Sequence, residues 1–214
     1  MANKIASKSL KTLERRHLII DKTLALIAQK GIDGVSIAEI AKATSLGHGQ
    51  IYRCFQDKNE ILKQVIQQVT QKRLILFHLG NHDIHKKAKE ISTIYQSDLT
   101  NDEVRLIYEL MKLNQQHPLF VYAQEADDSL TEFGLQMLRF KYPQATEAQI
   151  VALSEIVAIF TEGSLLRRLH GFSSRADIER LEQMFVVCLN ALDEMLDVPQ
   201  HSSSATTGHE SNFR

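Results

Sequence analysis

The sequence predicts an all-α protein with a small N-terminal head and a larger helical body. Apolar residues recur at helical spacing along most of the chain, and no alternating pattern typical of a strand persists long enough to compete. The three prolines, Pro118, Pro143 and Pro199, all stand at plausible ends of helices. The predicted helices cover 11–30, 36–43, 48–54, 58–79, 83–97, 101–116, 118–141, 146–170 and 175–197.

The second and third predicted helices form a helix-turn-helix pattern within residues 36–55. Ser36 is a favourable N-cap because its hydroxyl can accept from the first backbone N–H groups of a helix. A break at Thr44 and Ser45 is followed by a second short helix that starts at His48. Such a unit places its second helix in the DNA major groove. The apolar positions predicted to hold the two helices together are Ile40, Ala41, Leu46, Ile51 and Phe55.

With the helix before it, this region resembles the DNA-binding domain of the TetR family of bacterial transcriptional regulators. The resemblance covers roughly residues 13–65. It implies a three-helix head (1–57), joined by a fourth helix to a ligand-binding and dimerisation body (58–197). Residues 198–214, with a serine run and few apolar side chains, are predicted from composition to be a disordered tail. The positions that carry the resemblance are Ile19, Ile20, Leu24, Ile27, Gly31, Ser36, Ile40-Ala41, Ser45-Leu46-Gly47, the run from Gly49 to Phe55, Lys58 and Ile61-Leu62.

The chain departs from the family pattern at three positions. Ser45 replaces the usual turn glycine and is therefore expected to adopt a left-handed backbone conformation. Gly47 replaces the usual serine that opens the recognition helix, and it is a weaker N-cap. Cys54 replaces the usual aromatic residue or histidine before Phe55. The motif is retained, but these three substitutions are expected to affect the angle between the recognition helix and the helix before it.

Charge is unevenly distributed, although the chain as a whole has a formal net charge of −1. Residues 1–75 carry 13 Lys and Arg against 6 Asp and Glu, whereas residues 76–214 carry 12 against 20. A basic head on an acidic body is expected when only the head meets phosphates. The alternative is a solvated basic N-terminal segment formed by Lys4, Lys8, Lys11, Arg15 and Arg16.

The predicted DNA contacts lie on and beside the recognition helix. The amide of Gln50 can pair bidentately with adenine, and His48 and Arg53 can reach base edges or phosphates. Tyr52 resembles the family tyrosine that meets a phosphate, and ordinary surface polarity is the alternative for each residue. The whole predicted set is Ser36, Gly47, His48, Gln50, Tyr52, Arg53 and Lys58, of which Ser36 and Lys58 sit at helix starts that favour phosphate oxygens.

Aromatic, methionine and acidic side chains in the body are candidates for an apolar ligand pocket between helices. The resemblance implies such a pocket, although the same residues are also typical of an ordinary core. Glu162 stands on an otherwise apolar helix face and needs a partner, which is either a cationic ligand or the nearby Arg167 or Arg168. Glu109 and Arg105 are further polar candidates for the interior. The predicted ligand-binding residues are Tyr95, Tyr108, Met111, Phe120, Phe133, Met137, Phe160 and Glu162.

The helices predicted at 146–170 and 175–197 each carry an apolar face wider than one packing stripe needs. Both faces belong either to the core of a monomer or in part to a second copy. Helix-turn-helix proteins usually dimerise to read two half-sites, and the resemblance implies a four-helix dimer interface made by these two helices. We therefore expect a homodimer on a palindromic operator.

The sequence argues against a metal site, a membrane or secreted location, and an enzyme. His78, His82 and His85 have metal-like spacing, but Gly80 and Asn81 between them indicate a helix end, so we expect neither metal nor cofactor. Two cysteines give no disulfide framework, and no membrane span or signal peptide is apparent, so a cytoplasmic protein is expected. No nucleophile–base pair or phosphate-binding glycine loop supports an enzyme.

The expected function is that of a DNA-binding transcriptional regulator, most often a repressor in this family, that a small-molecule ligand releases from DNA. A DNA-binding protein without a small-molecule effector, either architectural or dependent on a protein partner, is the alternative.

Overall fold

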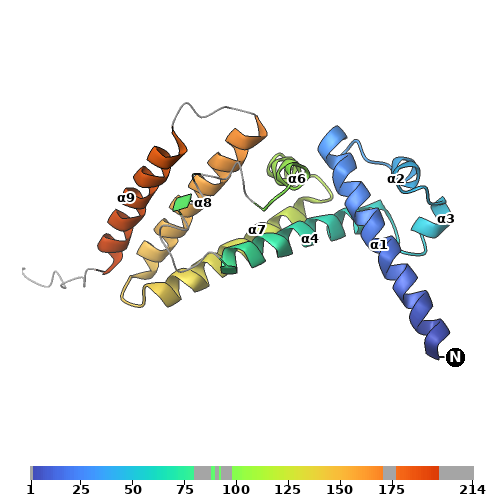
Figure 1. Cartoon of the computed structure of the whole chain (residues 1–214), viewed down its shortest axis with the longest axis horizontal. Coiled ribbons are helices and arrows are strands. Elements are labelled where there is room, and N and C mark those ends of the chain that lie inside the picture. The colour runs from blue at the N-terminus through green and yellow to red at the C-terminus, as the bar shows by residue number, and fades with distance from the viewer. Residues whose placement is uncertain (1, 80–87, 90–91, 93–97, 171–176, 198–214) are drawn as a thin grey trace, which may run out of the picture.

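The computed structural model describes residues 2–79, 88, 89, 92, 98–170 and 177–197, and it contains eight helices and no strand within those residues. The all-α fold class predicted from the sequence is confirmed. The helices are α1 (Ala2–Lys30), α2 (Ile37–Thr44), α3 (His48–Ile51), α4 (Lys58–Leu79), α6 (Asn101–Met111), α7 (Phe120–Lys141), α8 (Glu147–Leu169) and α9 (Ile178–Asp197) (Figure 1).

Several helix ends differ from the prediction. The first helix starts at Ala2 rather than residue 11, so the basic N-terminal segment is helical. The recognition helix stops at Ile51, because the backbone tightens and Cys54 N–H donates to the carbonyl of Ile51. The helix predicted to run to residue 116 stops at Met111. Of the helix predicted at 83–97, only residues 88, 89 and 92 are described, and the predicted disordered tail at 198–214 lies outside the described residues.

The long first helix ends at a glycine that the backbone requires. Gly31 has φ of 77°, a left-handed conformation that glycine adopts without steric cost, and its N–H donates to the carbonyl of Ile27 at 2.8 Å. Ile19, Ile20, Leu24 and Ile27 are all buried on the inner face of α1. The spacing of these four residues, predicted from sequence, therefore marks the side of α1 that packs against α4 and α6.

The main hydrophobic core is continuous between head and body. It runs from Ile19 in α1 and Ile51 in α3 through Ile61 in α4 to Leu106 in α6 and Leu165 in α8. A smaller cluster centres on Ile150 and lies between α7 and α8. Because α4 contacts both α1 and α7, it connects the head mechanically to the body. The predicted domain boundary between residues 57 and 58 stays a prediction.

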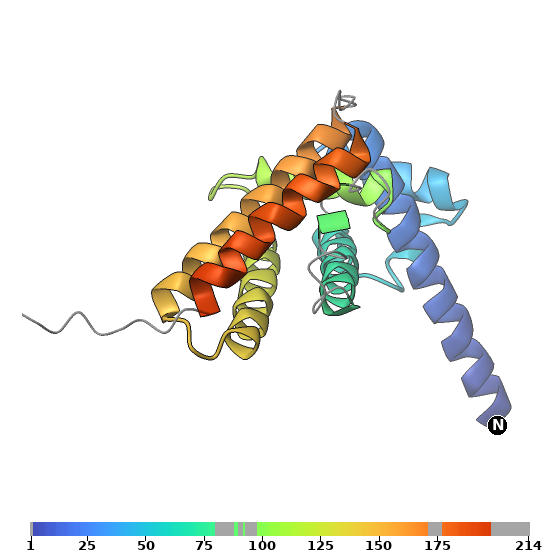
Figure 2. The same ribbon diagram turned by 60° about the vertical axis from the view of Figure 1, so that its left-hand side comes forward.

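The last two helices, α8 and α9, lie side by side at the end of the molecule opposite the head, as both ribbon views show (Figures 1 and 2). The rings of Phe160 and Phe185 meet edge to face at 5.6 Å between centroids and join the two helices. This arrangement leaves the outer sides of both helices uncovered by the rest of the described chain.

Candidate nucleic-acid interface and body cavity

The turn between α2 and α3 is built by two capping arrangements. The hydroxyl of Ser36 accepts from the Glu39 N–H at 3.3 Å, while the Glu39 carboxylate accepts from the Ser36 N–H at 3.1 Å. This is a complete capping box, and it starts α2 at the residue that the sequence predicted. The hydrogen bond from Lys30 is the main cause that lowers the pKa of the Glu39 carboxyl. The Glu39 charge at this helix start is thereby paired with a cation.

The turn itself needs a residue in the left-handed region, and Ser45 takes that conformation with φ of 55° and ψ of 29°. The strained backbone expected for Ser45 is therefore confirmed. For a residue with a side chain this conformation costs on the order of 1 kcal/mol relative to glycine. Leu46 then packs against the core cluster, so the turn keeps its geometry despite the cost at Ser45.

The recognition helix and the turn that follows it present polar residues to solvent and apolar residues to the core. His48, Tyr52 and Arg53 are exposed, Gln50 is partly buried, and Tyr52 retains 54% of its accessible surface. Ile51 and Phe55 are buried, as the sequence predicted. The helix and its turn therefore carry the exposed contact candidates His48, Tyr52 and Arg53.

The start of the recognition helix is capped by the residue predicted to read a base. The amide oxygen of Gln50 accepts from the N–H of Gly47 at 2.9 Å, which is the reciprocal half of a capping box; the other half, a bond from an N-cap side chain to the first N–H groups of the helix, is missing because Gly47 has no side chain. This oxygen has a second lone pair, and the amide N–H₂ group keeps both donors. A Cβ atom built on Gly49 would meet nothing within 4 Å, so the backbone is open to close approach there.

Ser36 and Lys58 lie together because their helices start beside each other. The Lys58 ammonium donates to the carbonyl of Val35 at 3.2 Å, and Asp57 caps α4 by accepting from the Glu60 N–H at 2.8 Å. The Ser36 hydroxyl is already engaged with Glu39. Lys58 keeps two further donors, so of the two residues it is the better placed to contact an additional oxygen.

Arg16 makes contacts that are inconsistent with the solvated basic segment considered for it. Its guanidinium donates to the carbonyl of Cys54 and lies 4.2 Å from the centre of the Phe55 ring. A nitrogen of the same group lies 3.7 Å from the carboxylate of Glu60. These three contacts attach α1 to the segment that follows the recognition helix. No local pattern predicts these contacts, because the partners are 38 or more positions away.

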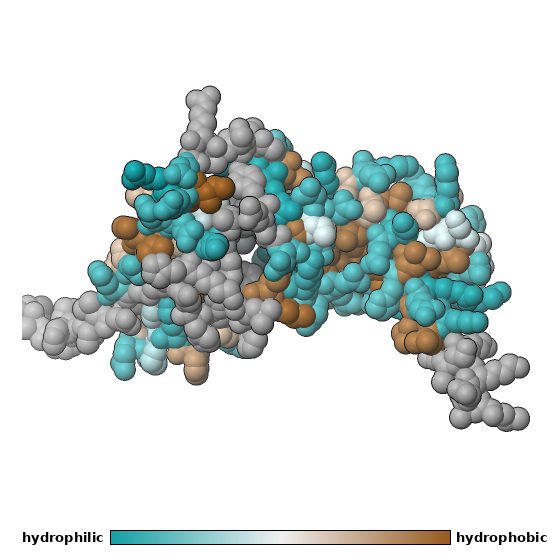
Figure 3. Space-filling view, viewed as in Figure 1, coloured by the Kyte–Doolittle hydropathy of each residue, from teal (hydrophilic) through white to brown (hydrophobic). Residues whose placement is uncertain are grey.

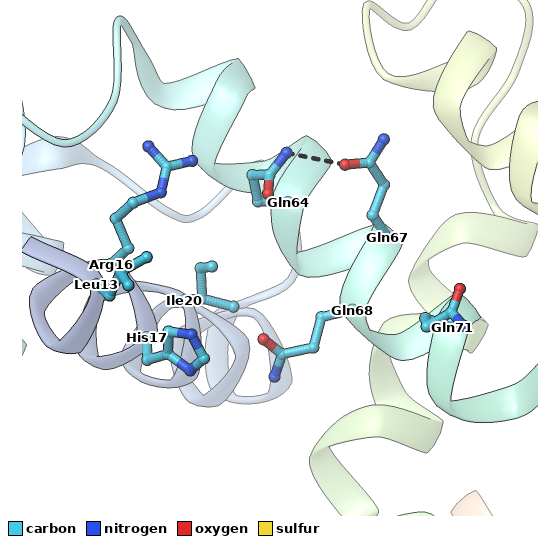
Figure 4. A pocket seen from close by; sticks show the side chains of 8 residues that line it. All are labelled: Leu13, Arg16, His17, Ile20, Gln64, Gln67, Gln68 and Gln71. Carbon is cyan, nitrogen blue, oxygen red and sulfur yellow. Dashed lines mark hydrogen bonds between the residues drawn. The ribbon is translucent and has the colours of Figure 1, made fainter. Parts of the chain in front are cut away.

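A shallow cavity of about 360 Å³ lies beside Arg16, between α1 and α4. Figure 4 shows Leu13, Arg16, His17 and Ile20 on the α1 side, facing Gln64, Gln67, Gln68 and Gln71 from α4. The amide of Gln64 donates to Gln67 at 2.8 Å, and Gln68 donates to Asp21 at 3.4 Å. The glutamine side chains therefore make hydrogen bonds along the α1–α4 junction as well as facing solvent.

The body touches the head at the turn between α1 and α2. The carboxylate of Glu109 in α6 accepts from the N–H of Ile32 at 3.1 Å, and a Cβ on Gly31 would lie 2.9 Å from the same carboxylate. His117, just before α7, pairs with Asp33 at 3.0 Å. Glu109 was predicted as an interior polar residue, and its role is to join α6 to the head. Arg105, predicted alongside it, is exposed.

A second cavity of about 360 Å³ lies in the body between α4, α6, α7 and α8. Three of the predicted ligand residues, Met111, Phe120 and Glu162, line it. Tyr108, Phe133, Met137 and Phe160 do not, and Tyr95 lies outside the described residues. The Tyr108 ring instead packs edge-on against His170 at 5.9 Å, and that of Phe160 packs against Phe185.

The charges of this cavity include residues that the sequence analysis missed. Arg73 lines it from α4, with Asp127 and Asp128 from α7. Burial raises the pKa of the Glu162 carboxyl, and repulsion from Asp127 adds to the rise. Burial likewise lowers the pKa of the Arg73 guanidinium. The negative charges of Glu162 and Asp127 act in the opposite direction and raise this pKa. Arg73 is therefore the cation that acts on Glu162. Arg168, one of the two partners proposed from the sequence, donates instead to Leu99 and Asn101.

The outer faces of α8 and α9 are apolar and exposed. On α8 these residues are Val151, Ile159 and Leu166, which fall within about 80° of one another around the helix axis. On α9 they are Met184, Val187 and Met195, which share a similar sector. Figure 3 shows hydrophobic patches at the end of the molecule where Figure 1 places these helices.

By length and composition alone, α8 could cross a membrane, which corrects the expectation that no segment qualifies. Of the apolar window in α8 that meets this criterion, 17% is buried inside the structure. Among the residues that the structure describes, no group of three His, Cys, Asp or Glu side chains could hold a metal ion. The side chains of His78, His82 and His85 lie outside that description.

Comparison with known proteins agrees with the head geometry. Residues 19–65 match the family model of bacterial regulatory proteins of the tetR family. The chain is 37% identical over 109 residues to the transcriptional regulator AcrR of Shigella flexneri, a match that covers 46% of this chain and 48% of AcrR. The chain thus spans about half the length of this relative.

Solved structures resemble the fold over most of the chain. A transcriptional regulator from Aquifex aeolicus VF5 has a TM-score of 0.61 at 18% identity, covering 83% of this chain and 98% of its own. The multidrug-binding protein EbrR, solved in complex with malachite green, has a TM-score of 0.59 at 20% identity, covering 84% and 98%. At these identities the likeness concerns the fold alone.

Proposed function

We propose that the chain is a member of the TetR family of bacterial regulatory proteins, whose model matches residues 19–65, and that it is a sequence-specific DNA-binding transcriptional regulator. In this proposal it acts in the bacterial cytoplasm as a repressor that a small-molecule ligand releases from a palindromic operator. The observation that carries the proposal is the helix-turn-helix, whose core is buried while His48, Tyr52 and Arg53 are exposed and Gln50 is partly exposed on one short helix and its turn.

The proposed DNA contacts divide into those that position the protein and those that read the sequence. Tyr52 and Lys58 contact phosphates, together with the backbone at the start of α2 near Ser36. Gln50 reads an adenine edge, and its hydrogen bond with the Gly47 N–H holds its amide at the start of the recognition helix. His48 and Arg53 reach neighbouring base edges or phosphates, and Gly47 lets the backbone come close to the groove.

The proposed dimer forms through the helices predicted at 146–170 and 175–197, which are α8 and α9. Support comes from the exposed stripe on each helix, represented by Ile159 with 63% and Met184 with 61% of its surface accessible. Large apolar surfaces of this kind on soluble proteins mark association sites. Two copies joined there present two recognition helices, as a palindromic operator requires.

Ligand response is proposed to pass through α6. Ile107, Leu110 and Met111 of this helix line the body cavity, and Glu109 of the same helix accepts from the N–H of Ile32 beside the head. A ligand that favours a different position of α6 would therefore change the orientation of the head. Such differential binding to two states is what lowers DNA affinity. The multidrug-binding neighbour EbrR supports a ligand site in this fold.

The test is selection of bound duplexes from a random pool by the full chain, followed by affinity measurement on the enriched sequence. We expect a palindrome bound by a dimer. Gln50→Ala should weaken binding to that palindrome by about 1–3 kcal/mol and relax the preference at one base pair in each half-site. Gln56→Ala removes the same type of side chain from an exposed position outside the recognition helix. It should change neither the affinity for the palindrome nor the base preference.

Recovery of random sequences with uniformly weak, steeply salt-dependent binding would refute sequence-specific regulation and leave the head as a non-specific phosphate binder.

A further inference from the structure

The body cavity combines an apolar wall with an unbalanced set of charges. Ile66, Val69, Ile107 and Leu110 contribute to the wall, with the ring of Phe120 and the flexible side chain of Met111. The charged residues are one cation, Arg73, and three carboxylates, Asp127, Asp128 and Glu162. Formally the cavity carries two more negative charges than positive ones.

Arg73 does not neutralise this surplus. Within the described part of the chain no ion pair within 4 Å joins Arg73 to any of the three carboxylates. Its attraction to Glu162 and Asp127 acts over a longer distance, in competition with the repulsion between those two carboxylates. Glu162 is half-buried, so water screens it less completely than the exposed Asp127 and Asp128.

A carboxylate in this position is stabilised by a cation brought close to it. We propose that the cavity binds a small organic cation, an amphipathic amine or ammonium compound, as the ligand of this regulator. The charged nitrogen lies between Glu162 and Asp127, and the apolar part lies against Phe120 and Met111. The proposal rests on the ligand-responsive function proposed above and adds the charge class of the ligand.

The walls suit both parts of such a molecule. A volume of about 360 Å³ falls at the lower end of typical small-molecule sites, about 300–1,000 Å³. An aromatic ring attracts a cation over its face, and a methionine side chain adapts to irregular apolar shapes. An anionic ligand would gain Arg73 but would meet the three carboxylates, so the charge balance favours the cation.

The experiment compares three ligands with one skeleton: 4-phenylbutylamine, 4-phenylbutanol and 4-phenylbutanoate, which at neutral pH are a cation, a neutral molecule and an anion. Their affinities for the full chain are measured by titration calorimetry. We expect the amine to bind about tenfold more tightly than the alcohol, since hydrogen bonds to charged groups are on average stronger than neutral ones by roughly the free energy of a tenfold change in affinity. The carboxylate should bind most weakly.

Matched variants locate the effect. Glu162→Gln keeps the shape of the side chain, and it should lower amine affinity by about tenfold while leaving the alcohol unchanged. Glu125→Gln removes the same charge from an exposed position on α7 outside the cavity and should change neither affinity. Thermal unfolding of both variants establishes that they fold.

Equal affinities for amine and alcohol, tightest binding of the carboxylate, or no amine binding at millimolar concentration would each overturn the cation proposal. So would equal effects of Glu162→Gln and Glu125→Gln. The selection of DNA is done without any ligand. An enriched palindrome combined with failure of the amine therefore refutes the ligand class alone, whereas failure of the selection refutes the regulator function.

Discussion

Replacing Arg16 by glutamine tests whether this cation stabilises the fold or only contacts DNA phosphates. Arg16 donates to the Cys54 carbonyl, lies 4.2 Å from the centre of the Phe55 ring and lies 3.7 Å from Glu60. Arg15 is its neighbour on the same helix, carries the same charge and makes none of these contacts. Arg15→Gln is therefore a matched control.

The expected cost follows from the three contacts. A hydrogen bond from a charged donor contributes about 1.5–3 kcal/mol, and an exposed cation–π contact about 0.5–1 kcal/mol. The partly exposed pair with Glu60, whose atoms are 3.7 Å apart, adds little. Since such contributions are not additive, we expect Arg16→Gln to lower the free energy of unfolding by about 2 kcal/mol, which for a chain of this length is a fall in Tm of about 4–8 °C.

Stability is measured by chemical and thermal unfolding of the wild type and the two variants, and DNA affinity is measured over a range of salt concentrations. Arg16→Gln should destabilise the protein and weaken DNA binding, because the segment after the recognition helix loses its attachment to α1. Arg15→Gln should leave stability unchanged. If the two variants are equally stable and differ from the wild type only in salt dependence, Arg16 is a solvated phosphate-binding residue and the reasoning is refuted.

Three further predictions concern the turn, the recognition helix and the body cavity. Ser45→Gly should raise the free energy of unfolding by about 1 kcal/mol, because φ of 55° suits glycine better, and denaturant unfolding that shows a loss instead would contradict this. Gly49→Ala should not lower Tm, since its Cβ meets nothing, yet should weaken binding to the selected operator in a fluorescence titration; unchanged affinity would exclude close backbone approach at that residue. Burial raises the pKa of Glu162 above its ordinary value of 4.5, so its charge costs stability at neutral pH and the cost disappears as pH falls toward 4.5. Glu162→Gln should accordingly raise Tm near neutral pH and progressively less toward pH 4.5, and a gain that grows on acidification would contradict this sign.

Local patterns carried most of what the sequence could predict. The capping residue Ser36 and the buried pair Ile51 and Phe55 follow from spacing within a few positions, and the left-handed turn residue Ser45 follows from its place at the glycine of the family pattern; the structure has all of them. Helix ends were less certain, because the stop at Ile51 depends on how the chain tightens toward Phe55.

Contacts between residues far apart in the sequence could not be predicted from it. The charges of Arg73, Asp127 and Glu162 share a cavity only because α4, α7 and α8 pack at particular angles. The adjacent pair Asp127-Asp128 was visible in the sequence, but nothing placed it near Glu162. The link from Glu109 to Ile32 likewise spans 77 positions. Aromatic content alone was a poor guide to the cavity, since Phe160 packs on Phe185 instead.

The most direct test of the central claim is the affinity of the full chain for its selected duplex relative to a scrambled duplex of equal length and composition, measured at several salt concentrations. A dimeric sequence-specific regulator should prefer the selected duplex by about 10³-fold or more at physiological salt, with two protomers bound per duplex. Equal affinity for the two duplexes, falling with the same slope as salt rises, would contradict the claim, because phosphate contacts alone would then account for all of the binding.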